Sequence, residues 1–201
     1  MEHRTHPIDG IAAPFLPAPF SAWFATRGWQ PRAHQLELLA RTQAGRSALL
    51  IAPTGAGKTL AGFLPTLTDL AARPKRKPGA ARRGVHTLYI SPLKALAVDI
   101  HRNLSTPVEE MALPVEIETR TGDTPVHKRQ RQKLKPPEIL LTTPEQTALL
   151  LSAPDADRFF GDLDRLGHRR VSIEPVQAQF HIVAQEQKDI VDRRSGIVRF
   201  D

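Results

Sequence analysis

Hydrophobic and polar positions along this chain follow two alternating patterns. Short apolar runs, bounded by glycine, proline or polar residues, are typical of buried strands. Between them, apolar residues recur three and four positions apart, which is typical of helices with one buried face. The predicted strands occupy residues 47–52, 85–90, 115–119 and 138–142, and the predicted helices occupy residues 21–29, 31–43, 58–72, 93–104, 127–134 and 144–152.

This alternation predicts an α/β fold with a mostly parallel sheet, because helical crossovers between short strands return the chain in the same direction. Pro31 stands where a first helical turn tolerates proline, so the second helix is expected to start there. Residues 1–19 are rich in proline and are expected to form an N-terminal segment outside the domain. Residues 73–84 are basic and lack large apolar side chains, so we expect a surface loop.

Composition narrows the class of protein. With 201 residues, of which 40% are hydrophobic, the chain can form one folded domain, with or without a tail. The absence of cysteine excludes disulfides and cysteine-ligated zinc or iron–sulfur centres. The net charge of +7 favours polyanions such as nucleic acid as partners. No apolar stretch has the length of a signal-peptide core or of a membrane span, so we expect a cytoplasmic protein without membrane contact.

The segment APTGAGKT, residues 52–59, matches the Walker A phosphate loop except that Ala52 replaces its first glycine. A predicted strand precedes it and a predicted helix follows it, which is the context that the motif requires. Glycines allow backbone N–H groups to curl around phosphates, the lysine reaches the β- and γ-phosphates, and the threonine hydroxyl can bind Mg²⁺. The alternative is a glycine-rich turn before a helix. The expected nucleotide-binding residues of the loop are Thr54, Gly55, Ala56, Gly57, Lys58 and Thr59, with Lys58 and Thr59 as catalytic residues and Thr59 as the magnesium ligand.

Three further strings accompany the phosphate loop: SPLKAL (91–96), TRTGDTP (119–125) and LLTTPEQTALLL (140–151). With APTGAGKT, they resemble motifs of superfamily 2 helicases, most closely the Lhr-like group and the ligase-associated DExH-box helicases of bacterial DNA repair. The resemblance covers roughly residues 20–165. It implies the first RecA-like motor domain, incomplete here and placed at 20–166, of an ATP-dependent DNA helicase or translocase. It also implies ATP and Mg²⁺ as cofactors.

The resemblance assigns roles to residues outside the phosphate loop. Gln35 occupies the place of the glutamine that recognises adenine, and Trp23, Phe24 or Trp29 could stack on the base. The alternatives are a solvated glutamine and aromatic residues that belong to the core. The residues implied to contact DNA follow three predicted strands, and they are Ser91, Lys94, Thr121, Gly122, Asp123, Thr143 and Glu145.

Ordinary turn chemistry is the alternative for each of these DNA-contact residues, since Thr143 before Pro144 can simply cap a helix. The basic runs at 73–83 and 127–135 could touch the DNA backbone, although such runs are more often solvated faces, which we favour for the first. Single-stranded or partly duplex DNA is the expected partner, together with repair proteins such as a ligase or nuclease. A monomer is expected.

The second acid box of such motors, Asp-Glu-x-His, is expected after residue 166, but the sequence contains no Asp-Glu pair. Residues 167–201 resemble nothing in the family, so a reading-frame shift or a truncation is our hypothesis for this tail. We expect the tail to pack poorly or to add at most a hairpin. We also expect weak Mg-ATP binding with little or no turnover, because the acid box orients the attacking water. The rivals are a non-catalytic nucleic-acid-binding regulator and a different P-loop enzyme such as a small kinase.

Overall fold

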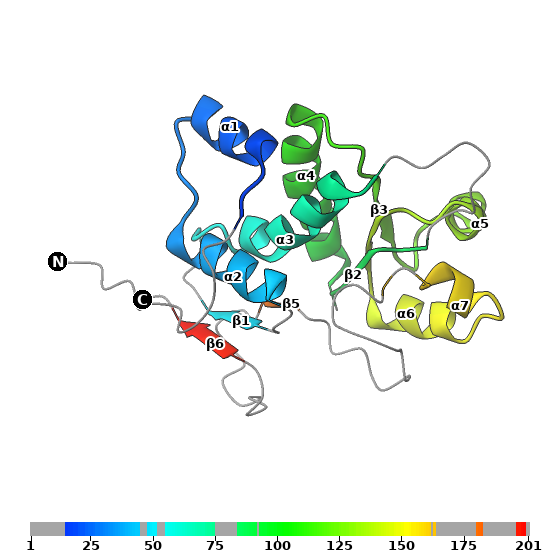
Figure 1. Ribbon diagram of the computed structural model, residues 1–201. Helices are drawn as coiled ribbons and strands as arrows, with labels where there is room; N and C mark the ends of the chain where they lie inside the picture. Colours follow the sequence, from blue (N-terminus) through cyan, green and yellow to red (C-terminus); the bar gives the residue numbers. More distant parts are fainter. Residues whose placement is uncertain are drawn as a thin grey trace. The chain divides into compact units, whose positions relative to one another are not determined.

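The computed structural model describes residues 15–44, 48–51, 55–74, 84–91, 93–161, 163, 180–182 and 196–199 (Figure 1). The chain divides into two compact units: unit 1 comprises Met1–Thr68 and Gln179–Asp201, and unit 2 comprises Asp69–Ala178. Each unit contains a three-stranded sheet in which all described pairings are parallel. The predicted α/β class with a parallel sheet is therefore confirmed, with the strands distributed over two sheets.

Unit 1 is built around the strand that precedes the phosphate loop. Its elements are α1 (Ala18–Thr26), α2 (Ala33–Gln43), β1 (Ala48–Ile51), the greater part of α3 (Lys58–Ala72), β5 (Phe180–Ile182) and β6 (Gly196–Arg199). Leu38 of α2, Leu50 of β1 and Ala61 of α3 are buried against one another. This small core therefore fixes both helices that flank the phosphate loop onto β1.

The two strands of the tail differ from what the sequence predicts. Both β5 and β6 pair with β1 in parallel, one on each side, in the order β5-β1-β6 (Figure 1). A hairpin would require the two strands to pair with each other in antiparallel fashion, so that expectation is wrong. The physical reason is that β1 offers two edges of unpaired backbone N–H and C=O groups, and each tail strand satisfies one of them.

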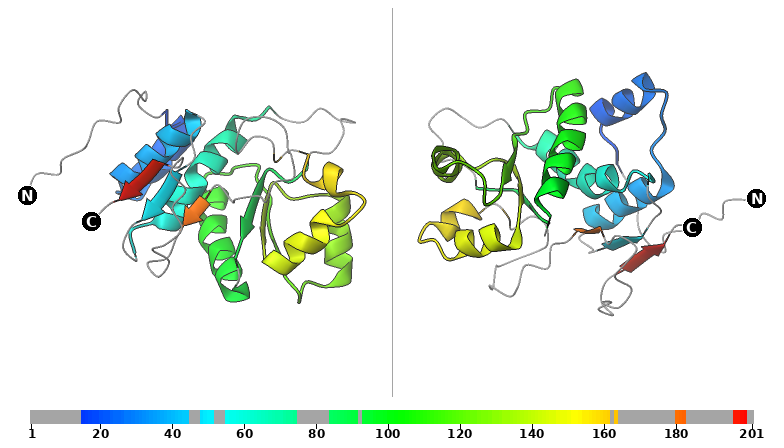
Figure 2. Two further views of the ribbon diagram at one scale, coloured as in Figure 1. Left: turned by 90° about the horizontal axis from the view of Figure 1, so that it is seen from below. Right: turned by 180° about the vertical axis from the view of Figure 1, so that it is seen from behind.

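Unit 2 contains the three strands whose ends carry the remaining motifs. Its elements are β2 (Thr87–Ile90), α4 (Lys94–Glu110), β3 (Ile117–Arg120), α5 (Val126–Leu134), β4 (Ile139–Thr142), α6 (Pro144–Leu151) and α7 (Ala156–Phe159). The strand order is β2-β4-β3. Helix α4 covers one face of this sheet, and α5, α6 and α7 lie on the other side (Figure 2). The core on that second side consists of Val85, Leu88, Leu140, Leu150 and Phe159.

Helix boundaries differ from the predicted ones by two or more residues in three helices. Helix α1 runs from Ala18 to Thr26, whereas residues 21–29 were predicted. Helix α2 begins at Ala33 and not at Pro31, because Arg32 is extended and its N–H is accepted by Gln35 Oε1 at 2.9 Å. Helix α4 continues to Glu110, beyond the predicted end at residue 104, and includes the buried Pro107. Most of the predicted basic loop, at residues 75–83, lies outside the described residues. The same holds for residues 1–14 of the proline-rich segment.

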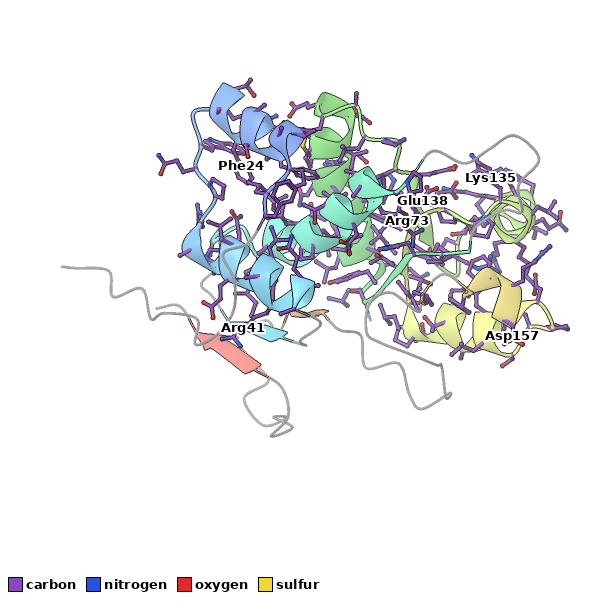
Figure 3. All side chains as sticks on the ribbon, viewed as in Figure 1. Phe24, Arg41, Arg73, Lys135, Glu138 and Asp157 are labelled. Carbon is purple, nitrogen blue, oxygen red and sulfur yellow. The ribbon has the colours of Figure 1, made fainter. Side chains whose placement is uncertain are left out.

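Segments of unit 1 that are distant in sequence are also joined by polar contacts. The Gln43 amide bonds both backbone groups of Phe15, at 3.2 Å to its N and 3.0 Å to its O, so the start of the described chain is tied to the end of α2. Within α2, Arg41 Nη2 lies 2.8 Å from Glu37 Oε1. Phe24 of α1, labelled with Arg41 in Figure 3, is buried. Among the helices that the structure describes, none is long and apolar enough to cross a membrane.

Candidate functional site

The described part of the phosphate loop has the backbone shape that its glycines predict. Gly55 and Gly57 have φ angles of +80° and +74°, a left-handed conformation that L side chains rarely adopt. A Cβ at Gly57 would lie 3.1 Å from Gln35 Nε2, so only glycine fits there without displacing the glutamine. The left-handed backbone at the two glycines fits a cradle of N–H groups for phosphate. Ala52, Pro53 and the predicted contact Thr54 lie outside the described residues.

The N-terminal turn of α2 supports this loop through three residues. Arg32 Nη1 donates to Gly55 O at 3.3 Å, His34 hydrogen-bonds the backbone of Ala56, and Gln35 Nε2 faces Gly57. Gln35 is buried, so it forms part of the loop's wall and is not a solvated helix residue. Sequence reasoning singled out Gln35 but missed Arg32 and His34. All three stand in the string PRAHQ, so the closeness of Arg32 and His34 to Gln35 in sequence was the signal that could have found them.

The surroundings of His34 favour its neutral form, because they lower its pKa. Burial lowers its pKa below the ordinary value of 6.5, and the positive charges of Arg32 and Lys58 lower it further. The hydrogen bond to Ala56 opposes this shift only in part. A neutral imidazole can therefore support the loop without adding a third positive charge beside it.

Lys58 and Thr59 open α3 and are partly exposed. The first helical turn directs unsatisfied N–H groups and the positive end of the helix dipole towards the loop, which favours a bound phosphate.

Of the three candidate stacking residues, Trp23 and Phe24 are buried, whereas 51% of the surface of Trp29 is exposed. The Arg27 guanidinium carbon lies 5.0 Å from the centroid of the Trp29 ring and 5.3 Å from that of Trp23.

Unit 2 brings the three predicted DNA-contact loops to one edge of its sheet, because β2, β4 and β3 are parallel neighbours. Each loop begins with a hydroxyl residue that is buried: Ser91, Thr121 and Thr143. Ser91 Oγ bonds both backbone groups of Leu93 at 3.2 Å, and Thr121 N–H donates to Thr124 Oγ1 at 2.9 Å. These contacts stabilise the loops from within.

Thr143 stands at the N-cap position of α6, but its hydroxyl makes no capping bond to the backbone. Its hydroxyl instead bonds the Glu145 carboxyl, which lowers the pKa of Glu145, and the backbone N–H of Glu145 and the charge of Lys94 lower it further. Simple helix capping therefore does not account for this side chain.

The exposed members of the three loops are Lys94, Gly122, Asp123 and Glu145. Lys94 Nζ lies 2.8 Å from Asp123 Oδ2, and its charge acts on Glu145, so one lysine links all three loops. Contact with a ligand can come from these exposed groups and from loop N–H groups. A phosphate arriving at Lys94 would compete with Asp123 for its ammonium group.

Most basic residues of the run at 127–135 make contacts inside unit 2. Arg131 pairs with Glu118, Lys133 with Asp155 at 3.3 Å, and Lys135 with Glu116 at 2.6 Å. Lys135 and Glu138 are labelled in Figure 3, and Glu138 Oε2 accepts the Glu116 N–H at 2.8 Å. These residues attach the helix to its neighbours and do not form a free basic face.

A family model described as DEAD/DEAH box helicase matches residues 32–168, which include all the loops described above. The chain belongs to this helicase family. Among its relatives, the Lhr helicase/probable uracil glycosylase of Mycolicibacterium smegmatis is 42% identical over 65% of this helicase chain and 9% of its own length. The Lhr helicase/uracil glycosylase of Escherichia coli is 36% identical over 85% of the chain and 13% of its own length. The chain thus spans about a tenth of these curated relatives.

Solved structures agree with this assignment. The M. smegmatis helicase Lhr bound to ssDNA and AMP-PNP superposes on 73% of the chain and 19% of its own, with a TM-score of 0.64 and 36% identity. The DUF1998 helicase MrfA bound to DNA and AMPPNP superposes on 76% of the chain and 21% of its own, with a TM-score of 0.60 and 27% identity. In sequence and in fold, the chain is therefore similar to part of the Lhr helicases.

Proposed function

We propose that this chain binds Mg-ATP through unit 1 and single-stranded DNA through unit 2, as a segment of an Lhr-type DNA helicase. The observation that carries the proposal is the phosphate loop, with two left-handed glycines and three supporting residues at the start of α2, namely the N-cap Arg32, His34 and Gln35. The two structural relatives that hold DNA together with an ATP analogue support the same pair of ligands. ATP would supply the free energy for movement along DNA.

The residues assigned to ATP are those that the loop geometry brings together. Gly55, Ala56 and Gly57 would surround the phosphates, Lys58 would neutralise them, and Thr59 would bind Mg²⁺. Gln35, beside Gly57, would select adenine through its amide, and Thr54 belongs to the same loop in sequence.

The residues assigned to DNA surround Lys94. Lys94, Gly122, Asp123 and Glu145 are exposed, whereas Ser91, Thr121 and Thr143 would act by holding the loops that present them. Because the phosphate backbone carries the charge, binding should be independent of sequence and should weaken as salt rises.

Two matched lysine variants test the proposal. Lys58→Ala should abolish binding of a fluorescent ATP analogue and leave the affinity for labelled oligothymidylate unchanged, since the two sites use different residues. Lys94→Ala should do the reverse, weakening DNA binding by roughly 3- to 10-fold at low salt, as expected for one lost phosphate contact. Fluorescence anisotropy measures both affinities.

Unchanged nucleotide binding in Lys58→Ala would refute the phosphate-loop assignment. Salt-dependent DNA binding without any ATP binding would favour the non-catalytic regulator instead. Phosphorylation of a small molecule would favour the kinase.

We further propose that the chain turns over little or no ATP, because its sequence contains no Asp-Glu pair for the acid box. An interruption of the reading frame near residue 166 would explain this, and most of 167–201 lies outside the described residues. Four expectations stay predictions: a role in DNA repair, association with a ligase or nuclease, a monomeric state and a cytoplasmic location.

A further inference from the structure

The turn between β3 and α5 has an asymmetric distribution of hydrogen bonds. Three of its four carbonyl groups are used inside the protein: Thr121 O accepts from Thr124 N at 3.2 Å, and Gly122 O and Thr124 O accept from Arg129. By contrast, within the described residues the backbone N–H groups of Gly122 and Asp123 donate to no protein acceptor. Both residues are exposed, so the turn is accessible to a ligand.

Arg129 produces this asymmetry with one side chain. Its Nη2 donates to Gly122 O at 2.7 Å and its Nε donates to Thr124 O at 2.6 Å, so the guanidinium holds both sides of the turn. A planar fork with several donors can make both bonds at once, which a lysine ammonium on a flexible stem reproduces poorly.

Arg129 is itself fixed by buried polar neighbours. Arg120 of β3 is buried, and its Nη1 donates to Arg129 O at 3.3 Å and to Gln132 Oε1 at 3.5 Å. The Gln132 amide in turn donates to Glu118 Oε2 at 2.7 Å. The position of the turn is therefore set by a chain of contacts that runs from the sheet through α5.

We propose that Arg129 is a positioning residue, which holds the Thr121–Thr124 turn with its carbonyls inward and its Gly122 and Asp123 N–H groups ready for a phosphate oxygen of single-stranded DNA. The proposal rests on the DNA-binding function proposed above. It assigns Arg129 no contact with DNA, although Arg129 belongs to a basic run that suggests one. The turn is thus ordered before DNA arrives, and less free energy is spent on ordering it upon binding.

Salt dependence distinguishes a positioning residue from a phosphate contact. The affinity of the full chain for labelled oligothymidylate is measured over a series of NaCl concentrations for Arg129→Lys, Arg129→Gln and the control Lys128→Gln. Both Arg129 variants should weaken binding by about tenfold, as expected for the loss of charge-assisted hydrogen bonds that order the turn. The slope of log K against log salt should stay at the wild-type value, because no ionic contact with phosphate is lost.

A different pattern would overturn the proposal. If Arg129→Lys bound DNA like wild type, and if the slope for Arg129→Gln were smaller in magnitude by about 0.7, Arg129 would be a direct phosphate contact.

Amide hydrogen exchange gives a readout that needs no DNA. Exchange in residues 121–124 should be faster in Arg129→Lys than in wild type or Lys128→Gln, and equal exchange would refute the positioning role. If wild type fails to bind DNA while exchange responds as expected, the proposed function fails and the positioning role stands.

Discussion

At the scale of single residues, the phosphate loop depends on side chains from another helix. Gly57 needs both its left-handed φ of +74° and its lack of a Cβ, because Gln35 Nε2 occupies the adjacent space. His34 bonds the neighbouring Ala56, and burial is the main cause of its lowered pKa. A buried imidazole that resists protonation makes the stability of unit 1 depend on pH.

The direction of this dependence follows from the shift. Because the folded pKa of His34 is below its ordinary value of 6.5, the unfolded chain binds a proton more readily than the folded chain does. The free energy of unfolding should therefore be highest above pH 6.5 and fall as pH is lowered towards the folded pKa, by at most about 1.4 kcal/mol per pH unit from this group.

His34→Gln should reduce this loss between about pH 7.5 and about pH 5.5, since glutamine does not titrate. Urea unfolding followed by tryptophan fluorescence reports on unit 1, because both tryptophans, Trp23 and Trp29, lie in it. The control is His127→Gln, at an exposed position of α5, and its pH dependence should be that of wild type. An identical pH dependence in wild type and His34→Gln would show that His34 is not the group responsible.

At the scale of elements, α5 is attached to its sheet by polar contacts where most helices use apolar ones. Gln132 is fully buried, with 0% of its surface exposed, and its Nε2 donates to Glu118 Oε2 at 2.7 Å and to Thr119 O at 3.1 Å. Arg131 pairs with the same Glu118. Removal of one partner would leave a carboxylate and a carbonyl partly unsatisfied in the interior.

Gln132→Ala should accordingly destabilise unit 2 by about 1–3 kcal/mol, whereas Gln130→Ala on the exposed side of the same helix should change the free energy of unfolding by less than about 0.5 kcal/mol. Amide hydrogen exchange of β3 and β4 in the two variants measures the difference within unit 2. Equal protection of these strands in both variants would mean that the polar network adds no stability.

At the scale of the whole molecule, the two proposed binding sites fall in different units, and the sequence contains no acid box of the expected form. The phosphate loop lies in unit 1. The three loops that follow β2, β3 and β4, which Lys94 links, lie in unit 2. No Asp-Glu pair occurs anywhere in the sequence, and in such motors that pair positions magnesium and the attacking water.

Phosphate release from Mg-ATP should therefore stay at the level of the Lys58→Ala blank, with or without oligothymidylate, even where both ligands bind. A coupled phosphate assay measures this. Turnover that rises with DNA and is absent in Lys58→Ala would mean that another carboxylate replaces the acid box. If turnover is absent, translation of the other two frames of the coding DNA after codon 150 tests whether an interrupted frame is the cause.

The sequence predicted well those features that depend on neighbouring residues. Helix α3 runs from Lys58 to Ala72 as its apolar spacing indicated, and β1 lies within the predicted run at 47–52. The glycines of the phosphate loop have the positive φ angles that the motif requires. The tail was beyond this reasoning, because pairing of β5 and β6 with β1 depends on contacts over more than a hundred positions.

By itself, then, the sequence determined the order of strands and helices from α1 to α6, the phosphate-loop motif and the family, because apolar periodicity and motif spacing are local properties. Only the tertiary structure decided which polar side chains are exposed and which are bound to groups of the protein itself. Arg129 has the same charge whether it meets solvent or two carbonyls, and Ser91 has the same hydroxyl whether it is exposed or buried. That difference depends on which distant backbone groups the fold brings within hydrogen-bonding distance.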